Sequence, residues 1–337
     1  MKAVAYKTPG PIEREDSLQD ITVEKPKAEG RDILVKIMAV SVNPVDTKLR
    51  KAKPPEGSEW RVLGFDAAGV VEAIGPEVQN FKPGNAVFYA GSIARPGTNS
   101  EYHLVDERIV GLKPASLSDA EAAALPLTAI TAWEMLFDRL DVNRPTAQGG
   151  NTILVVGGAG GVGSITIQLL RALTDLTVIA TASRPETQDW VRECGAHHVI
   201  DHRQPLAPQV EALDIGAPGF VFSTTQTQQH LADIIELIAP QGRFGLIDDP
   251  EELNIMPLKL KAVSLHWELM FTRSLFDTPD MAEQGKLLNE VAALVDSGRI
   301  RSTATEVTGK IDATSLRAVH AQIESGSTRG KIVLQGF

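Results

Sequence analysis

A run of glycines between two apolar segments constrains the fold of this chain more than any other feature. The run spans residues 157–163 and directly follows the β-branched segment 152–156. The next segment, 164–173, carries apolar residues at helical spacing. Strand, glycine turn and helix in this order are the context that separates a dinucleotide-binding G-x-G-x-x-G motif from an ordinary glycine-rich turn. The sequence therefore predicts a phosphate-binding turn at this place.

The glycines of the motif have separate expected roles. Gly158 is expected to make the tight turn, and Gly160 to let the backbone approach a pyrophosphate. Gly163 is expected to let the helix pack closely on its strand. Free N–H groups at the start of the helix, including those of Gly161 and Val162, would then face the phosphates.

The end of the second strand bears on the choice between NAD and NADP. A free ribose 2′-hydroxyl is bound by a carboxylate roughly twenty residues after the glycines, but residues 176–184 contain none. Ser183 and Arg184 offer a hydroxyl and a guanidinium group instead, which match a 2′-phosphate in charge and geometry. The sequence predicts NADP(H). The alternative is that Arg184 is a solvated loop residue ahead of Pro185.

Composition and charge fit a two-domain soluble enzyme. The 337 residues are 43% hydrophobic and 23% charged, which is ordinary globular usage. No apolar run reaches the length of a membrane span, and the first residues do not resemble a signal peptide, so we expect a cytoplasmic protein. A net charge of −10 argues against nucleic acid or anionic lipid as the main partner.

Cysteine usage limits the metal chemistry. Cys194 is the only cysteine, so neither an intrachain disulfide nor a Cys-rich structural zinc site can form. Its place near a predicted helix end indicates a buried helix residue. The seven histidines show no metal-ligand spacing beyond the adjacent His197 and His198, which are better explained as a helix-to-strand connector.

The remaining pattern predicts an α/β protein with two parts. Before the glycine run, short strands with Pro and Gly turns indicate a partly closed barrel, with a turn to helical pattern at residues 120–125 and 131–140. After it, strands and helices alternate, which predicts a doubly wound parallel sheet. Expected strands are 33–42, 67–74, 86–90, 101–105, 153–156, 178–181, 199–200, 220–223, 242–247, 262–265 and 331–334, the last rejoining the barrel; expected helices are 164–173, 186–193, 229–238 and 281–296.

Several strings together resemble the medium-chain dehydrogenase/reductase superfamily, in its quinone oxidoreductase branch. They are residues 43–50, 64–75, 81–88, 125–140, 157–163 and 329–334, while 181–191 and 266–274 resemble the zinc-type alcohol dehydrogenase-like subgroup. The resemblance implies a GroES-like β-barrel domain (1–127 and 268–337), a Rossmann NADP-binding domain (128–267) and an active site in the cleft between them. It also implies a homodimer paired through the edge strand 262–267.

The subgroup's name refers to zinc, but this chain lacks the residues that bind zinc in zinc-dependent members. Zinc-dependent members hold the metal with a Cys in the segment matching 40–46 and a His in the segment matching 64–66, where this chain has no Cys and has Phe65. No metal site is therefore expected. Without a Lewis acid, alcohol oxidation through an alkoxide is disfavoured, whereas hydride transfer to a conjugated acceptor needs only hydrogen bonds to the delocalised charge.

The function that follows is NADPH-dependent reduction of quinones or α,β-unsaturated carbonyls. One alternative is a zinc-type alcohol dehydrogenase with noncysteine ligands. Another is a non-enzymatic NADPH-binding sensor or structural protein.

The resemblance also implies site residues. Asn43, Asp46 and Lys48 would face the nicotinamide and substrate, with Lys48 as a proton donor or a positive charge at a position where related reductases often have tyrosine. The alternative is that Asn43 and Asp46 are turn residues around Pro44.

Further contacts are expected on both sides of the cofactor. Thr128 and Thr131 resemble nicotinamide-contacting threonines, or else cap a helix. Ser223 and Leu246 end strands at the edge where a Rossmann ligand lies, and Lys331 resembles a cofactor-facing lysine, against the default of a solvated one. The residues expected to line the substrate cleft are Phe65, His266, Trp267 and Phe271, although aromatic residues at a strand edge more often belong to a core or a dimer interface.

Overall fold

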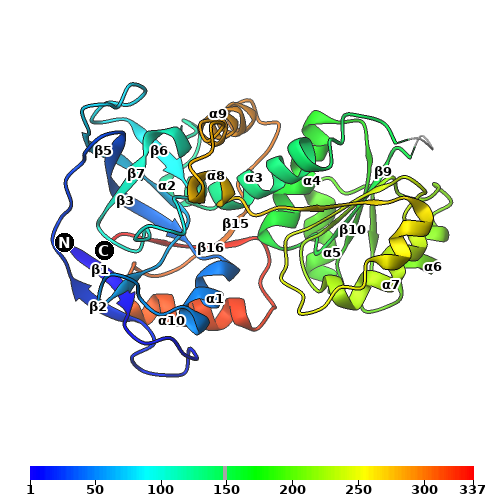
Figure 1. The fold of residues 1–337 in the computed structure, drawn as a ribbon, viewed down its shortest axis with the longest axis horizontal. Helices are drawn as coiled ribbons and strands as arrows, with labels where there is room; N and C mark the ends of the chain where they lie inside the picture. The colour runs from blue at the N-terminus through cyan, green and yellow to red at the C-terminus, as the bar shows by residue number, and fades with distance from the viewer. Residues whose placement is uncertain (147–149) are drawn as a thin grey trace. The chain divides into compact units, whose positions relative to one another are not determined.

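The chain divides into two units, which the computed structural model describes over residues 1–146 and 150–337 (Figure 1). The first unit comprises Met1–Ile130 and Phe271–Phe337, and the second comprises Thr131–Met270. The second unit therefore begins at residue 131 and ends at 270, where the sequence suggested 128 and 267. The helix that carries the chain from one unit to the other is α3 (Pro126–Trp133).

The second unit is built on a parallel sheet. Its strands are β9 (Thr152–Val156), β10 (Thr177–Thr181), β11 (His198–Ile200), β12 (Phe220–Ser223), β13 (Arg243–Leu246) and β14 (Ser264–Trp267). They form a six-stranded sheet in the order β11-β10-β9-β12-β13-β14, and every neighbouring pair is parallel. The order reverses direction between β9 and β12, so the predicted doubly wound sheet is confirmed.

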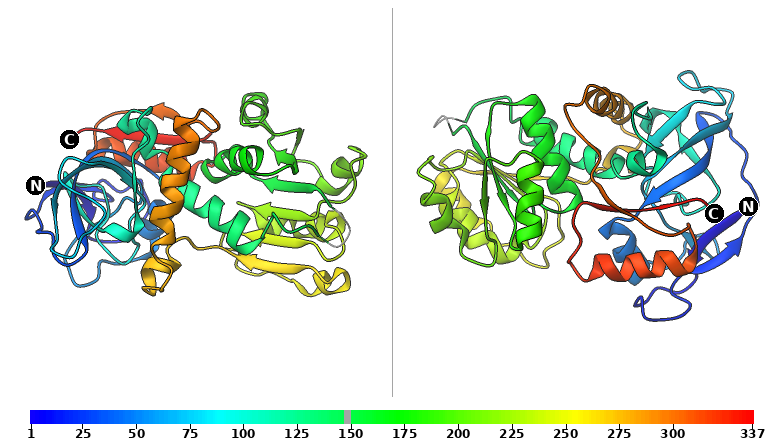
Figure 2. Two further views of the ribbon diagram at one scale, coloured as in Figure 1. Left: turned by 90° about the horizontal axis from the view of Figure 1, so that it is seen from above. Right: turned by 180° about the vertical axis from the view of Figure 1, so that it is seen from behind.

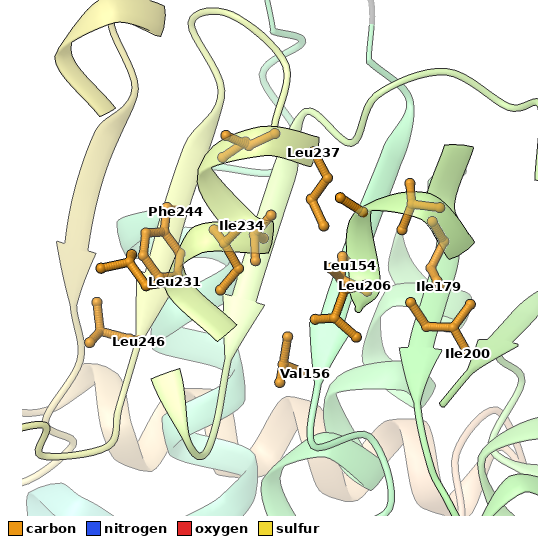
Figure 3. Packing of buried hydrophobic residues seen from close by; sticks show 14 of the residues in the cluster. Leu154, Val156, Ile179, Ile200, Leu206, Leu231, Ile234, Leu237, Phe244 and Leu246 are labelled. Atoms are coloured by element: carbon orange, nitrogen blue, oxygen red, sulfur yellow. The ribbon is translucent and has the colours of Figure 1, made fainter. Parts of the chain in front are cut away.

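Helices cover both faces of this sheet (Figures 1 and 2). The strand order runs in opposite directions on the two sides of β9, so right-handed crossovers place the helices of the two halves on opposite faces. They are α4 (Gly161–Leu173), α5 (Pro185–Glu193), α6 (Leu206–Glu211) and α7 (Thr227–Leu237), with a short 3₁₀ segment, η3 (Met256–Lys261). Leu154, Val156 and Phe244 point from the strands into a core that is closed by α6 and α7 (Figure 3). Burial of the apolar strand faces stabilises the sheet at roughly 25 cal/mol per Å² of apolar surface.

The first unit contains a largely antiparallel sheet. Its strands are β3 (Asp32–Ser41), β5 (Ala67–Ile74), β6 (Ala86–Tyr89), β7 (Tyr102–Asp106), β8 (Val110–Leu112), β15 (Ala304–Val307) and β16 (Lys331–Gln335). The seven strands run β15-β16-β3-β5-β6-β8, with β7 also paired to β3. Val333 of β16 pairs with Ser41 of β3, so the prediction that the strand at 331–334 rejoins the barrel is confirmed.

The first unit has further elements, and two of them were predicted: the helical patterns at 120–125 and 281–296 correspond to α2 (Asp119–Ala123) and α9 (Glu283–Asp296). A small sheet has the order β2-β1-β4, with β1 (Lys2–Tyr6), β2 (Gln19–Thr22) and β4 (Arg61–Val62). The remaining helical segments are α1 (Pro44–Ala52), η1 (Glu107–Ile109), α8 (Thr272–Leu275) and α10 (Ala313–Glu324). Asn43 precedes α1 and Pro44 opens it, so this segment is a helix start, where proline is favoured because its missing N–H is not needed.

Two predicted elements need correction. The helix expected at 131–140 is α3 followed by a π-helical segment, η2 (Glu134–Arg139). The edge strand expected from Ala262 begins at Ser264, because Ala262 has a φ of 50°, which an extended strand does not allow. In the part of the chain that the structure describes, no helix is both long enough and apolar enough to cross a membrane.

Candidate functional site

The glycine turn after β9 has the shape of a phosphate cradle. Gly157 has a φ of 81°, so the left-handed residue of the turn is Gly157, directly before the Gly158 to which the tight turn was assigned. A Cβ on Gly158 would meet the Cβ of Ala180 at 2.9 Å. The N–H of Gly157 donates to Thr181 Oγ1 over 2.9 Å, which ties the turn to β10.

The other two glycines differ in what surrounds them. A Cβ on Gly163 would meet the carbonyl oxygen of Gly157 at 2.3 Å, whereas a Cβ on Gly160 would come no nearer to any atom outside its chain neighbours than 3.6 Å, to Gly157 O. Gly163 is therefore needed for packing of the fold itself, and Gly160 leaves room for another molecule. Helix α4 begins at Gly161, so the N–H groups of Gly161 and Val162 have no intrahelical acceptor. These residues fit a pyrophosphate.

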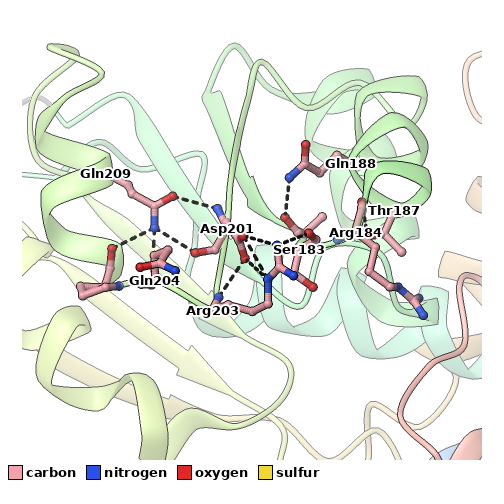
Figure 4. A network of polar contacts seen from close by, with 10 residues as sticks. Ser183, Arg184, Thr187, Gln188, Asp201, Arg203, Gln204 and Gln209 are labelled. Atoms are coloured by element: carbon pink, nitrogen blue, oxygen red, sulfur yellow. Dashed lines mark hydrogen bonds and ion pairs between the residues drawn. The ribbon is translucent and has the colours of Figure 1, made fainter.

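Two arginines lie at the carboxyl ends of β10 and β11 (Figure 4). Arg184 pairs with Glu186 over 3.2 Å, and its side chain is 39% exposed. Arg203 donates to the carbonyl oxygen of Ser183 over 2.8 Å and is held by Asp201, with an N–O distance of 2.7 Å. The structure thus brings Arg203, which sequence reasoning missed, beside Ser183. The available signal was a cation just beyond the strand predicted at 199–200.

The residues expected at the ends of β12 and β13 are engaged inside the second unit. Ser223 is fully buried, and its Oγ lies 2.7 Å from Thr227 Oγ1. The N–H of Thr227 donates to Asp248 over 2.8 Å at the start of α7. Leu246 packs in the hydrophobic core (Figure 3). The side chains of Ser223 and Leu246 therefore have structural partners, and a ligand would meet this edge mainly through the backbone.

In the first unit, four donors converge on the buried carboxylate of Asp66. Ser41 Oγ and Asn43 Nδ2 donate over 2.8 Å each, Lys331 Nζ over 3.1 Å, and the N–H of Leu127 over 2.8 Å. Lys331 also donates to Val42 O and to Asn43 Oδ1. All three N–H donors of the ammonium group therefore have acceptors, and a cofactor contact by Lys331 would require one of these bonds to break. Asp66 itself was missed by sequence reasoning, although a carboxylate inside an apolar string was a signal.

Helix α1 places its two ionisable candidates differently. Asp46 is buried and accepts from the N–H groups of Asn43 and Gly64 over 2.8 and 2.9 Å. Burial raises the pKa of Asp46 to about 7, although these hydrogen bonds and Lys331 oppose the shift. Lys48 lies on the exposed side of the same helix. The structure therefore gathers Asn43 and Asp46 around Gly64 and Asp66, and leaves Lys48 outside that cluster.

The expected substrate-lining residues fall into two pairs. Phe65 and Phe271 are buried in the first unit and meet edge to face, with ring centroids 5.3 Å apart. His266 and Trp267 lie in β14, where His266 Nε2 is 2.9 Å from Ser264 Oγ and Trp267 is 55% exposed. Phe65 and Phe271 belong to the first unit, and His266 and Trp267 belong to the second.

The threonines expected at the nicotinamide belong to α3. Both are buried. Thr128 Oγ1 donates to the carbonyl oxygen of Leu125 over 3.0 Å, and Thr131 opens the second unit.

The positions of the His, Cys, Asp and Glu side chains bear on whether a metal ion could bind. Within residues 1–146 and 150–337, no three His, Cys, Asp or Glu side chains are placed so that they could hold a metal ion together. Cys194 is buried at the end of α5, as the sequence predicted. The residues that the structure describes do not fit a zinc site.

Two family models match the chain. An alcohol dehydrogenase GroES-like domain matches residues 29–115, and a zinc-binding dehydrogenase family matches residues 194–334. The first match lies within the first unit, and the second covers the C-terminal half of the second unit together with the part of the first unit that follows it.

The chain is also similar to known proteins along its whole length. A zinc-type alcohol dehydrogenase-like protein of Staphylococcus aureus is 40% identical over 338 residues, 99% of each chain. The solved structure of a Rhizobium etli protein, named as a zinc-dependent alcohol dehydrogenase, is 63% identical, with a TM-score of 0.98 over 100% of this chain and 98% of that one. A Pseudomonas syringae quinone oxidoreductase structure is 26% identical, with a TM-score of 0.84 over 99% of each chain. The chain therefore belongs to the medium-chain dehydrogenase/reductase superfamily, in its quinone oxidoreductase-like branch, and is an oxidoreductase that uses a nicotinamide cofactor.

Proposed function

We propose that this protein is a zinc-independent, NADPH-dependent reductase of quinones or α,β-unsaturated carbonyls. The observation that carries the proposal is the pair of residues at 65 and 66. Phe65 stands where zinc-dependent relatives have a metal-binding histidine, and Asp66 beside it is saturated by donors from Ser41, Asn43 and Lys331. A metal ion would have to displace those donors.

The choice of NADPH rests on the cations near Ser183. Arg184 and Arg203 flank the place where the adenosine ribose lies in a doubly wound sheet, and a guanidinium group binds phosphate in a two-pronged geometry. The carboxylate of Asp201 is already bonded to Arg203 through both oxygens, so it is occupied by a cation and not open to a ribose hydroxyl. When bound, NADPH supplies the hydride of the reaction.

This chain's own residues orient the reactants. Gly160 and the first turn of α4 hold the pyrophosphate, and Thr128 and Thr131 are the candidates for contacts with the nicotinamide. Asn43 and Asp46 act as positioning residues, because their polar atoms fix the start of α1 and the backbone at Gly64. Lys48, on the exposed side of α1, is the candidate for a positive charge near the reduced substrate.

We also propose that the protein is a homodimer that pairs through β14. That strand ends the sheet order, and apolar side chains stand out beside it: Leu260 is 93% exposed and Met256 67% exposed. Ile255, Leu258 and Val263 line an apolar hollow at the same place. Light scattering should give twice the chain mass, and Leu260→Glu with Met256→Glu should give monomers. A monomeric unmodified protein would refute the dimer.

The function is tested by following NADPH oxidation with a panel of quinones, enones, enals and aldehydes. We expect turnover with members of the first three classes, faster with NADPH than with NADH. Oxidation of simple alcohols that depends on added zinc would favour the alcohol dehydrogenase alternative. NADPH binding without turnover of any substrate would favour the sensor.

A further inference from the structure

Two glutamates of the second unit lie against each other at the carboxyl end of the sheet. Glu134 opens the π-helical segment η2, one turn after Thr131. Glu268 directly follows β14, and its N–H donates to the carbonyl oxygen of Leu246 at the end of β13. The carboxyl end of the strands in the half of the sheet beyond the reversal is where the nicotinamide half of a dinucleotide lies. The pair therefore stands at the reacting end of the unit.

Both carboxyl groups are withdrawn from water, and the guanidinium group of Arg139 lies beside them. Glu134 is 1% exposed and Glu268 is 6% exposed. Arg139 Nε donates to Glu268 Oε2 over 2.9 Å, and the side chain of Glu134 is in hydrogen-bonding contact with that of Glu268. Two ionised carboxylates beside one guanidinium group would leave an excess buried negative charge, which is strongly unfavourable.

A shared proton removes this conflict. If both glutamates were ionised, the buried Oε1 of Glu268 would have no hydrogen-bond donor among residues 1–146 and 150–337. Two ionised carboxylates only accept, so they cannot bond to each other, whereas one protonated carboxyl donates to the other. Burial and the neighbouring Glu134 raise the pKa of Glu268 to about 8, and Arg139 only partly opposes the shift.

We propose that Glu134 and Glu268 share one proton at neutral pH and that this proton is the one delivered to the reduced substrate. The inference rests on the proposed function. It replaces Lys48 as the proton source with a pair of acids that has no assigned role in the reaction.

For an enone, bound NADPH would supply hydride by breaking its nicotinamide C4–H bond, a C–H bond would form at the β-carbon, and the π electrons would move to give an enolate. The carboxyl O–H bond of the pair breaks, and its proton bonds to the α-carbon, directly or through one water molecule. The pair is left as two carboxylates beside Arg139, and a proton from solvent restores it. For a quinone, the same proton goes to a hydroquinone oxygen.

Other ionisable groups on the packed elements are few. Arg139 and Asp138 lie on η2 with Glu134, and Asp138 is exposed. His266 lies on β14, and burial together with Arg243 and Arg139 lowers its pKa. Glu268, whose pKa is raised by burial and by Glu134, is therefore the group on these elements whose loss of a proton would be seen as pH rises above neutral.

The test uses Glu134→Gln and Glu268→Gln, with Asp138→Asn as the matched control on the same helical segment. Infrared spectra of the protein without cofactor should show a protonated carboxyl band at pH 7 that disappears as pH rises through about 8. Both glutamine variants should lose this titration, and the control should keep it. Absence of the band from the unmodified protein would overturn the shared proton.

Kinetics then test the use of the proton. With the best substrate of the panel, turnover of the unmodified protein should fall as pH rises through about 8, because the acid must be protonated. Each glutamine variant should lose roughly 10²-fold or more in turnover and lose this limb of the profile, while NADPH affinity stays the same. Lys48→Met should keep the limb.

The outcomes separate the two proposals. Turnover by the unmodified protein with a pH profile that the glutamine variants leave unchanged, even if they melt at lower temperature, would overturn the proton role and leave the reductase function standing. Loss of the limb in Lys48→Met would also overturn it. No turnover by the unmodified protein on any quinone, enone or enal would overturn the reductase function, and the proton role with it.

Discussion

Lys331 donates a hydrogen bond to Asp66 across 3.1 Å, and both side chains are buried. Removing one partner of such a pair leaves an uncompensated charge in the interior, which typically costs ~3–5 kcal/mol. We expect Lys331→Met to lower the free energy of unfolding by about this amount. The double variant Lys331→Met with Asp66→Asn should be less destabilised than the single one, because no charge is left unpaired. Urea unfolding measures both, and equal losses in the two variants would contradict the pairing.

Cofactor selectivity should depend on both arginines near Ser183. Arg184→Ala and Arg203→Ala should each remove a charge-assisted contact with the 2′-phosphate, and each should weaken NADPH binding roughly ten- to hundredfold. NADH affinity should change little. Fluorescence titration with the two cofactors measures this, and Arg192→Ala, an exposed arginine of α5 paired with Asp189, is the control. Equal affinity of the unmodified protein for NADPH and NADH would count against the assignment.

Two glycines of the phosphate turn should respond differently to the same added methyl group. Gly163→Ala places a Cβ at 2.3 Å from Gly157 O, so α4 must move and the melting temperature should fall. Gly160→Ala finds its nearest such atom at 3.6 Å, so the fold should be kept while NADPH binding weakens. Thermal melting and cofactor titration of both variants check this. A stable Gly163→Ala protein with normal NADPH affinity would show that the turn is not a packed cradle.

The relatives' names refer to zinc, whereas the residues of this chain predict a protein without it. The zinc content of the purified protein decides between the two. With Phe65 at the usual histidine position and no metal-holding group of three side chains in the described ranges 1–146 and 150–337, the purified protein should contain well under one zinc per chain. Chelator treatment should leave NADPH-dependent reduction unchanged. Elemental analysis before and after dialysis measures the content. Stoichiometric zinc whose removal abolishes activity, and whose return restores it, would establish the alcohol dehydrogenase alternative.

A buried histidine of α10 should make the first unit sensitive to acid. His320 lies beside Arg50, whose Nε is 3.4 Å from its Nδ1, and burial together with Arg50 lowers the pKa of His320 from 6.5 to about 3. A base with a lowered pKa in the folded state stabilises the fold above pH 6.5, and this contribution is lost as pH falls toward about 3. The melting temperature of His320→Gln should therefore fall less steeply over this range than that of the unmodified protein. Parallel curves for the two proteins would refute the effect.

Local patterns predicted the second unit well. The β-branched segment before the glycines is β9, and the alternation after it gives the parallel order, because hydrophobic period and glycine placement are properties of neighbouring residues. The first unit was harder. Asn43 and Pro44 suit a turn and a helix start equally. The helix α1 is favoured because Arg50 is buried against α10, where it pairs with Glu324, a residue far away along the chain.

The candidate site was also predictable only where local sequence patterns define it. The glycine motif identified the phosphate turn, although the left-handed residue is Gly157. Arg203 and Asp66 were missed because their roles depend on partners more than ten residues away along the chain, Ser183 and Lys331. The contact between Glu134 and Glu268 likewise arises only when η2 packs against β14.

The hydrogen bonds around Asp66 also impose an order on assembly during synthesis. The second unit is one continuous stretch, Thr131–Met270, so all its strands are available once that stretch has left the ribosome. The first unit lacks β16 until residues 331–335 emerge, and Asp66 has no counter-cation until Lys331 arrives. A chain that stops before residue 331 therefore contains the continuous second unit but lacks β16 and the ammonium group that pairs with Asp66.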